Sequence, residues 1–339
     1  MTASLLSSRA PVSSPLVVTP AVAAHRGASG YRPEHTLEAF RVGVAQGADD
    51  VELDLVATRD GVLVVRHDLE LSRTTDVATR PALASRRTTK VVDGEPVTGW
   101  FVQDLDLAEL RTLTARERMP RARAGSAAHD GRHRVATFEE VVRLVRAESA
   151  VHGRSVGVLA ELKHAAHHQA AGLPLDALVH DALRRLGLDH DRSRVSVMAF
   201  EDEVLRRLAG QVRVPLVQLV DRREQVTRAR LAGIAAYADG IGARKDLLLR
   251  EGLGRRLVRR AHREWLTVHA WTLRAENRFL GRAFRSGEGG RRHGDLAAET
   301  RHLLDLGVDG LITDHPDRVA GARNTWVAQS SGINSQPTT

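Results

Sequence analysis

The sequence contains no cysteine among its 339 residues, and aromatic residues make up only 4% of it. A disulfide framework, a thiol nucleophile and a thiolate metal site are therefore excluded. So few aromatic side chains give poor support to a surface on which nucleic-acid bases would stack. No apolar run approaches the roughly 20 residues that a membrane-spanning helix needs, so we expect no stable membrane insertion.

Lysine is also scarce, although the chain is strongly basic. Only Lys90, Lys163 and Lys245 are present, whereas Lys and Arg together number 50 and the net charge is +8. The basic residues are scattered along the chain, as in Arg184-Arg185 and Arg255-Arg256, which is typical of solvated charged faces. We therefore expect no nucleic-acid partner. Because nearly all basic residues of the chain are arginines, the lysine at position 163 is unusual.

The length and the end segments suggest one large domain. A chain of 339 residues is long for an ordinary domain, but a barrel of alternating strands and helices reaches this size as a single unit. We expect a flexible leader at 1–16, a barrel at 17–322 and a flexible tail at 323–339. The leader lacks a basic start followed by a long apolar run, so it is a poor secretory signal. A cytoplasmic location is expected, with secretion as the alternative.

Short apolar strands alternate with amphipathic helices over most of the chain, a pattern that predicts a parallel sheet with helices outside it. Capping residues support some of the helices, such as Thr137 followed by Glu140. The expected helices include 33–46, 105–113, 175–186, 201–208, 248–264 and 300–306. The expected strands are 17–24, 50–57, 62–65, 156–162, 195–200, 215–220, 237–242, 266–272 and 310–313.

These nine strands are one too many for a closed eight-stranded barrel. The link between strands 50–57 and 62–65 is too short for a crossover helix, so one βα unit must be irregular. We predict an α/β fold, a TIM-type (β/α)8 barrel irregular near its second and third strands. A polar insertion at about 69–134 follows the third strand. The sequence leaves open which strand lies outside the barrel.

Histidines and carboxylates lie at or near the ends of several expected strands. They are His25, Glu52, Asp54, His67 and Glu161. In a parallel barrel the carboxyl ends of the strands carry the reactive groups. Three carboxylates without sulfur ligands favour a hard divalent cation, Ca²⁺ or Mg²⁺. Pairing of the carboxylates with nearby arginines is the alternative, and spacing alone leaves both open.

The order of the motifs resembles the glycerophosphodiester phosphodiesterase family over about residues 20–320. The first motifs are His25-Arg26-Gly27, Pro33-Glu34-His35-Thr36, Glu52-Leu53-Asp54 and His67-Asp68. Glu161-Leu162-Lys163, Phe200-Glu201, Trp271-Thr272 and 307–314 follow in the expected order. One departure is His35, where the family usually has Asn.

The resemblance implies roles for individual residues. His25 and His67 would carry protons, Arg26 and Lys163 would bind phosphate, and Phe200 and Trp271 would form a pocket wall. Glu52, Asp54 and Glu161 would hold one Ca²⁺ or Mg²⁺ ion. The implied reaction is hydrolysis of a small-molecule glycerophosphodiester to sn-glycerol 3-phosphate and an alcohol such as choline or ethanolamine. The oligomeric state stays open.

Four other residues receive weaker predictions. Glu34 is expected to support Arg26, and Asp314 is expected to brace the last strand end. His167 and His168 resemble a loop in one branch of the family, which makes a substrate contact an alternative to surface packing.

Two other barrel functions compete with this interpretation. A phospholipase or sphingomyelinase D-like phosphodiesterase would need an apolar loop that docks on a membrane, and the insertion is polar and charged. A non-catalytic phosphate-binding barrel would predict the loss of a histidine or a carboxylate, and all of them are present.

Overall fold

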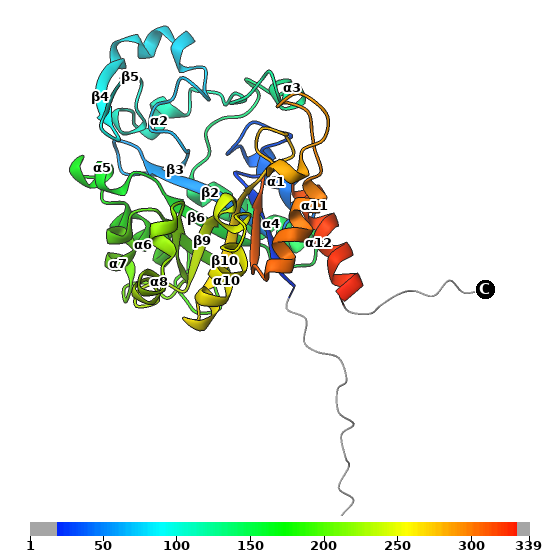
Figure 1. Ribbon diagram of the computed structural model, residues 1–339. Helices are drawn as coiled ribbons and strands as arrows, with labels where there is room; N and C mark the ends of the chain where they lie inside the picture. The colour runs from blue at the N-terminus through cyan, green and yellow to red at the C-terminus, as the bar shows by residue number, and fades with distance from the viewer. Residues whose placement is uncertain (1–18, 331–339) are drawn as a thin grey trace, which may run out of the picture.

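Eight parallel strands close into a barrel in the computed structural model, which describes residues 19–330 (Figure 1). β1 pairs with both β2 and β11, which closes the ring. Almost every residue of these strands is buried, and most of the strands are rich in apolar residues. The strands are β1 (Ala21–His25), β2 (Asp50–Ala57), β6 (Gly157–Leu162), β7 (Val195–Ala199), β8 (Leu216–Val220), β9 (Gly240–Arg244), β10 (Thr267–Leu273) and β11 (Gly310–Thr313). The predicted TIM-type barrel is confirmed.

The strand outside the barrel is β3 (Leu63–Val65). It pairs antiparallel with the carboxyl-terminal part of β2, with Leu55 opposite Val65. β1 pairs with β2 only as far as Glu52, so the longer β2 extends past its neighbour. The short link after β2 makes a hairpin there instead of a crossover, as its length requires.

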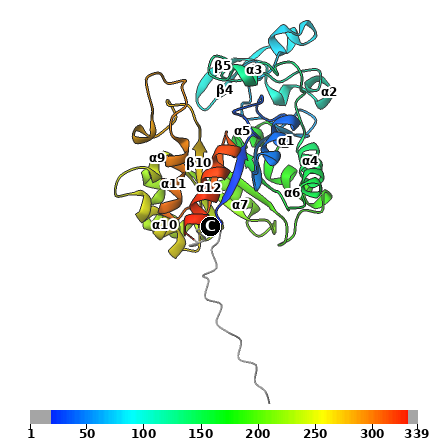
Figure 2. The ribbon, with the colours of Figure 1, turned by 90° about the vertical axis from the view of Figure 1, so that its right-hand side faces the viewer.

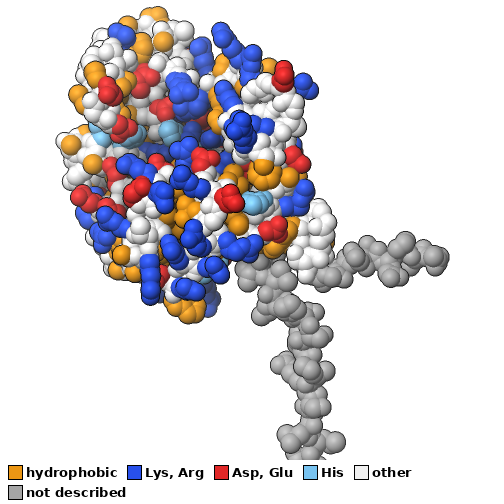
Figure 3. Space-filling view, in the orientation of Figure 1, with side chains coloured by type: hydrophobic (Ala, Val, Ile, Leu, Met, Phe, Trp, Pro, Cys, Tyr) orange, Lys and Arg blue, Asp and Glu red, His pale blue; other side chains and the backbone are white. Residues whose placement is uncertain are grey.

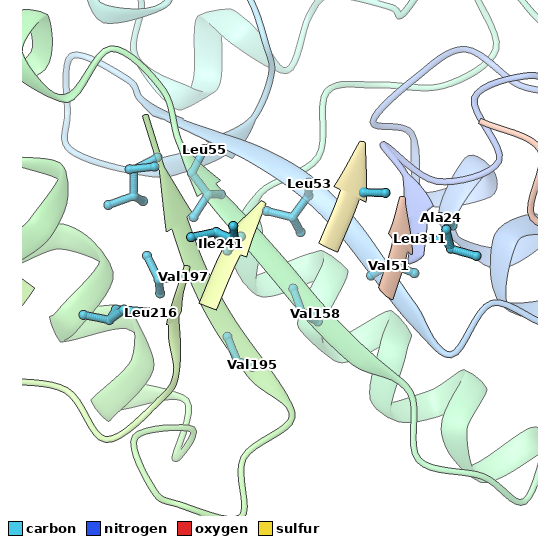
Figure 4. Packing of buried hydrophobic residues seen from close by; sticks show 14 of the residues in the cluster. Ala24, Val51, Leu53, Leu55, Val158, Val195, Val197, Leu216, Ile241 and Leu311 are labelled. Carbon is cyan, nitrogen blue, oxygen red and sulfur yellow. The ribbon is translucent and has the colours of Figure 1, made fainter. Parts of the chain in front are cut away.

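Helices cover the outside of the barrel (Figure 2). Val51, Leu53 and Leu55 of β2 face this helical layer, where they pack with other buried apolar residues (Figure 4). The alternate residues of β2, Glu52 and Asp54, point to the other face. The main helices are α1 (Leu37–Ala45), α4 (Phe138–Val151), α6 (Leu175–Arg185), α7 (Asp202–Leu208), α8 (Arg228–Ile234), α10 (Gly254–Arg263), α11 (Leu296–Leu306) and α12 (Pro316–Ser330).

Local capping explains where the first two long helices begin. The Thr36 hydroxyl accepts from the Ala39 N–H at 3.1 Å, so α1 begins at Leu37. Thr137 and Glu140 form the predicted capping box at the start of α4.

Two predicted boundaries were displaced on the far side of the barrel. β9 begins at Gly240 and not at Tyr237. The residue before it, Asp239, is bonded to both neighbouring strands and fixes where β9 enters the sheet. Its carboxylate accepts from the Leu216 N–H, and its carbonyl accepts from the Thr267 N–H. The predicted helix 248–264 is divided into a short turn, α9 (Lys245–Leu248), and α10 (Gly254–Arg263).

The insertion forms a lobe above the carboxyl ends of the strands (Figure 1). Its hairpin, β4 (Thr88–Val92) and β5 (Glu95–Gly99), was not predicted. Asp93 and Gly94 make its turn with positive φ angles of 51° and 86°, as an Asp-Gly hairpin turn requires. Two short helices, α2 (Leu107–Leu110) and α3 (Ala124–Ala127), follow. The lobe has its own apolar cluster, which includes Leu69, Leu71, Phe101, Leu105, Leu110 and Leu113.

The predicted tail from residue 323 is wrong as far as Ser330, because α12 continues through it. The buried Arg323 side chain donates to the Pro20 carbonyl and to Asp49, each at 2.8 Å. These bonds tie the helix to the residues that directly precede β1 and β2. The predicted leader and residues 331–339 lie outside the described residues. Between residues 19 and 330, no helix combines the length and the apolarity that crossing a membrane requires.

His168 lies in a short helix, α5 (Ala165–Ala170), and is fully buried. Neither of its ring nitrogens has a hydrogen-bond partner among the described residues. Burial, followed by the nearby His167 and His164, lowers the pKa of His168 to about 3. Its predicted contact with substrate has no support, because no residue of α5 lines the main cavity.

We expect the His168→Leu variant to lose less stability in acid than the parent. The pKa of His168 is near 6.5 in the unfolded chain but lower in the folded protein. Below pH 6.5 the unfolded chain therefore binds a proton that the folded protein does not, and the parent loses stability. Between pH 7.5 and pH 5 this one group should account for about 2 kcal/mol. Urea unfolding at the two pH values measures the difference. His190→Leu, at an exposed position, is the control, and an equal acid loss in parent and His168→Leu would contradict the expectation.

Candidate active site

One cavity of about 630 Å³ opens at the carboxyl ends of the barrel strands. Of the nine predicted site residues, only Asp54 is absent from its lining, and Asp54 is fully buried. The eight that line it are His25, Arg26, Glu52, His67, Glu161, Lys163, Phe200 and Trp271. The fold therefore brings together residues that are far apart in the sequence.

Three carboxylates meet below the cavity because of strand register. Glu52 and Asp54 are two residues apart on β2 and so share a face. Asp54 lies opposite Glu161 on β6. Each of the three offers an oxygen atom within 4.8 Å of the others.

Positive side chains stabilise this acidic group only in part. Lys163 Nζ lies 3.2 Å from Asp54 Oδ1 and 2.5 Å from Glu161 Oε1. Burial alone would raise the pKa of Asp54, but Lys163 and Arg26 hold it well below its usual value. Burial, with Asp54 and Glu161 close by, raises the pKa of Glu52 well above its usual value. Burial also raises the pKa of Glu161 to about 7. The group therefore lacks positive charge.

The carboxylates fit a hard divalent cation. Both oxygens of Asp54 and Oε1 of Glu161 are buried and, among the described residues, have no partner with hydrogen-bond geometry. Buried charge of this kind is expensive unless it is paired or bound to a metal. Carboxylate oxygens are the ligands that Ca²⁺ and Mg²⁺ prefer. Glu52, Asp54 and Glu161 are thus the residues that would hold the ion.

A second group with suitable donors is less favourable to a cation. Glu276, His293 and His315 also offer atoms within 4.8 Å of one another. However, both oxygens of Glu276 are engaged by Arg123, at 2.7 and 3.3 Å. Nδ1 of His293 lies 3.3 Å from an Arg318 nitrogen. Two guanidinium groups therefore already supply the positive charge here.

His25 is held by the carboxylate that follows β11. Its Nδ1 lies 2.6 Å from Asp314 Oδ1. An ionised carboxylate only accepts, so Nδ1 carries the proton and Nε2 keeps its lone pair. Burial and then the charge of Arg26 lower the pKa of His25 to about 3, so the ring is neutral at pH 7. Asp314 does not simply brace the strand end, as predicted, but orients a histidine.

His67 is held in the same way. Its Nδ1 lies 2.6 Å from Oδ1 of Asp68, the next residue in the chain. Burial and then Arg26 lower the pKa of His67 to about 4. Both histidines line the cavity as neutral rings with Nδ1 engaged by a carboxylate. Each Nε2 is therefore the nitrogen available for proton transfer.

Arginines neutralise the two orienting carboxylates. Arg123 and Arg274 donate to Asp314 Oδ2 at 2.6 and 2.8 Å. Although burial opposes ionisation, Arg274 and Arg123 hold the pKa of Asp314 well below its usual value. Arg118 donates to Asp68 Oδ2 at 2.7 Å. Each histidine is thus the outer member of a His–Asp–Arg series.

Arg26 lies between the carboxylates and the cavity. Its Nε is 3.1 Å from Asp54 Oδ2, and its Nη1 donates to Glu34 at 3.2 Å. Glu34 also accepts two bonds from Arg118, at 2.8 and 2.6 Å. The predicted support of Arg26 by Glu34 is therefore present. His35, the departure from the family pattern, accepts from the Asp54 N–H at 3.2 Å and so fixes the same carboxylate residue.

Phe200 and Trp271 form one wall of the cavity. Their rings meet edge to face, with centroids 5.5 Å apart. Trp271 Nε1 donates to the Gly242 carbonyl at 2.8 Å, and Lys163 Nζ lies 5.8 Å from the centre of the Phe200 ring. The wall is therefore fixed by polar contacts as well as by packing.

The arginines of the site were missed in the sequence. Arg118 and Arg123 come from the insertion, and Arg274 comes from the loop after β10. Nothing in an arginine-rich sequence distinguishes them from surface arginines. Asp68 carried a signal, because it follows His67 directly.

The comparisons with known proteins agree with the motifs. The model of the glycerophosphoryl diester phosphodiesterase family matches residues 25–318, which include all nine predicted site residues. A glycerophosphodiester phosphodiesterase of Arabidopsis thaliana is 31% identical over 321 residues, covering 86% of this chain and 82% of the relative.

Solved structures share the fold. A putative glycerophosphoryl diester phosphodiesterase of Silicibacter pomeroyi has a TM-score of 0.66 at 24% identity, covering 91% of this chain and 94% of the other. A phosphodiesterase of Oleispira antarctica, solved with the product sn-glycerol-3-phosphate, has a TM-score of 0.62 at 19% identity, covering 90% and 97%.

We expect the Asp314→Asn variant to lower kcat by about 100-fold or more and to change KM little. The amide cannot hold the Nδ1 proton as a carboxylate does, and a positioned proton carrier contributes about 10²–10⁴-fold. Asp309→Asn is a matched control, since Asp309 contacts His262 at 2.8 Å in an exposed pair elsewhere in the fold. An unchanged kcat in Asp314→Asn, or an equal loss of kcat in Asp309→Asn, would contradict the orienting role of Asp314.

Proposed function

The chain belongs to the glycerophosphoryl diester phosphodiesterase family, and we propose that it cleaves glycerophosphodiesters with one divalent cation and two histidines. The products are sn-glycerol 3-phosphate and an alcohol. One observation carries the proposal: two neutral histidines line a cavity together with Glu52 and Glu161, two members of a cluster of three buried carboxylates. The product bound to the related Oleispira antarctica phosphodiesterase supports the identity of the phosphate product.

Glu52, Asp54 and Glu161 would hold Ca²⁺ or Mg²⁺. When bound, such an ion polarises a phosphoryl oxygen and lowers the pKa of an oxygen nucleophile. Arg26 and Lys163 line the same cavity, where their charges attract the phosphodiester and stabilise the charge that develops on its oxygens.

His25 and His67 would divide the proton transfers. In the route we favour, the glycerol C2 hydroxyl oxygen attacks phosphorus while the bond from phosphorus to the alcohol oxygen breaks. One histidine accepts the hydroxyl proton at Nε2, and the other donates a proton to the departing oxygen. A neutral histidine can accept the hydroxyl proton directly. The other histidine must first be protonated in order to donate, and the negative charge of the bound phosphodiester favours its protonated form.

A cyclic phosphate results from this step. Water then attacks phosphorus, the bond to the C2 oxygen breaks, and the two histidines exchange roles. The tethered hydroxyl gains from proximity over free water. Direct attack by water on the diester is the alternative route.

The first test concerns the cation. Glu52→Gln keeps the acceptor for the Arg26 N–H, which is 3.0 Å from Glu52 Oε2, but removes a negative ligand. We expect metal affinity, measured by calorimetry, to fall by more than about 100-fold, since loss of even an outer partner costs about 10–100-fold. Activity should fall with it.

The control for this test is His293→Ala. This variant removes an exposed member of the second group of potential ligands. If metal affinity is unchanged in Glu52→Gln but lost in His293→Ala, the ion binds at the second group of potential ligands, and the assignment to Glu52, Asp54 and Glu161 is refuted.

The second test concerns the nucleophile. We expect a substrate whose C2 hydroxyl is replaced by hydrogen to bind normally but to react about 10⁵-fold more slowly, because the tethered nucleophile is gone. Its inhibition constant against the parent substrate measures binding, and single-turnover kinetics measure the chemical step. Turnover within about tenfold of the parent rate would show that water attacks the diester directly.

A further inference from the structure

The loop between β10 and α11, residues 274–295, brings three basic side chains to the cavity. Arg274, Arg278 and Arg285 all line it, and only Arg274 also contacts a carboxylate that orients a histidine. In Figures 1 and 2 this loop rises beside the insertion at the mouth of the barrel. Figure 3 shows many basic side chains where the loop and the insertion face each other.

Charge pairing separates these arginines into two kinds. Arg274 donates to Asp314, and Arg244, which also lines the cavity, donates to Asp246 at 2.7 Å. Arg278 and Arg285 have no carboxylate within 4.0 Å anywhere in residues 19–330. Two guanidinium charges therefore remain available to a bound molecule.

Both free arginines are held in place by uncharged contacts. The Arg278 guanidinium lies 4.6 Å from the centre of the Phe279 ring, and one of its nitrogens contacts Met119 Sδ at 2.6 Å. Nε of Arg285 donates to the Leu280 carbonyl at 3.0 Å. Their positions are thus fixed without neutralising their charge.

Arg274 lies against the same ring as Arg278, with its guanidinium 4.8 Å from the Phe279 centre. Arg274 is neutralised by Asp314, so the charge that remains near this ring is that of Arg278. Guanidinium groups bind phosphate oxygens with paired hydrogen bonds.

A cationic alcohol fits this part of the cavity poorly. Seven basic but only three acidic side chains line the whole cavity. An aromatic ring could in principle bind a quaternary ammonium group. The charged Lys163 Nζ already lies over the Phe200 ring, 5.8 Å from its centre, which leaves Trp271 as the ring without a cation. The excess of basic over acidic side chains still disfavours the expected choline and ethanolamine groups.

Resting on the proposed function, we propose that the preferred glycerophosphodiester carries a second anionic group, a phosphate, on its alcohol portion, which Arg278 and Arg285 bind. The single charge of the reacting diester is met by Arg26 and Lys163 beside the carboxylates. The second phosphate then reaches the two arginines of the β10–α11 loop.

Three substrates test this specificity. Glycerophosphoglycerol and its terminal phosphate differ only in the proposed group, and glycerophosphocholine carries a positive charge instead. Loss of each diester is followed by ³¹P NMR. An assay of released glycerol phosphate would be misleading, because both products of the phosphorylated ester are glycerol phosphates. We expect kcat/KM to be about tenfold or more higher for the phosphorylated ester than for glycerophosphoglycerol, mainly through KM, and lowest for glycerophosphocholine.

Variants assign this preference to the two arginines. The Arg278→Gln/Arg285→Gln double variant should lower kcat/KM at least about tenfold more for the phosphorylated ester than for glycerophosphoglycerol. Arg282→Gln is the matched control, because Arg282 is exposed in the same loop but does not line the cavity. The preference of the parent enzyme should also shrink in high salt.

Two outcomes would overturn the inference while leaving the proposed function intact. One is equal kcat/KM for all three substrates in the parent enzyme. The other is an equal loss for glycerophosphoglycerol and the phosphorylated ester in the double variant, which would mean that the arginines serve only the reacting diester. If none of the three substrates is cleaved, the proposed function is refuted, and this inference with it.

Discussion

The meeting of Glu52, Asp54 and Glu161 beneath the cavity is the constraint on which the rest of the site depends. Strand register fixes it, because Asp54 lies opposite Glu161 and Glu52 shares its face of β2. Three carboxylates this buried can coexist only with positive charge nearby. Lys163 and Arg26 supply part of that charge, and in the proposed function they are also the groups that attract a phosphodiester. On that proposal, stability of the barrel mouth and recognition of substrate have one electrostatic origin.

Strand periodicity made much of this predictable. The spacing of Glu52 and Asp54 places both on one face of a strand whatever its partners are. The position of β3 could not be predicted, because pairing of Leu55 with Val65 depends on how far β2 extends past its neighbours. The hairpin at Asp93 and Gly94 did have a local signal, since Asp-Gly favours its turn, and it was overlooked among the polar residues of the insertion.

The groups that orient the histidines were harder to find for a different reason. His25 ends β1 and His67 follows β3, so their approximate positions come from the alternation of strands and helices. Asp314 reaches His25 across 289 residues of sequence, and Arg123 reaches Asp314 across 191. Such ion pairs have no period and no required spacing. An arginine-rich composition further hides which arginines are buried, so only the folded arrangement distinguishes Arg123 from its surface counterparts.

The arginines also change how the insertion must be understood. Its sequence shows only that it is polar, yet Arg118 and Arg123 extend from it to the carboxylates that hold His67 and His25. Arg118 bonds to Asp68, the partner of His67, and Arg123 bonds to Asp314, the partner of His25. One short segment therefore contacts the orienting carboxylates of both histidines. A displacement of residues 118–123 would disturb the contacts of both histidines together, so the insertion and the barrel must be in place at the same time for either histidine to be held correctly.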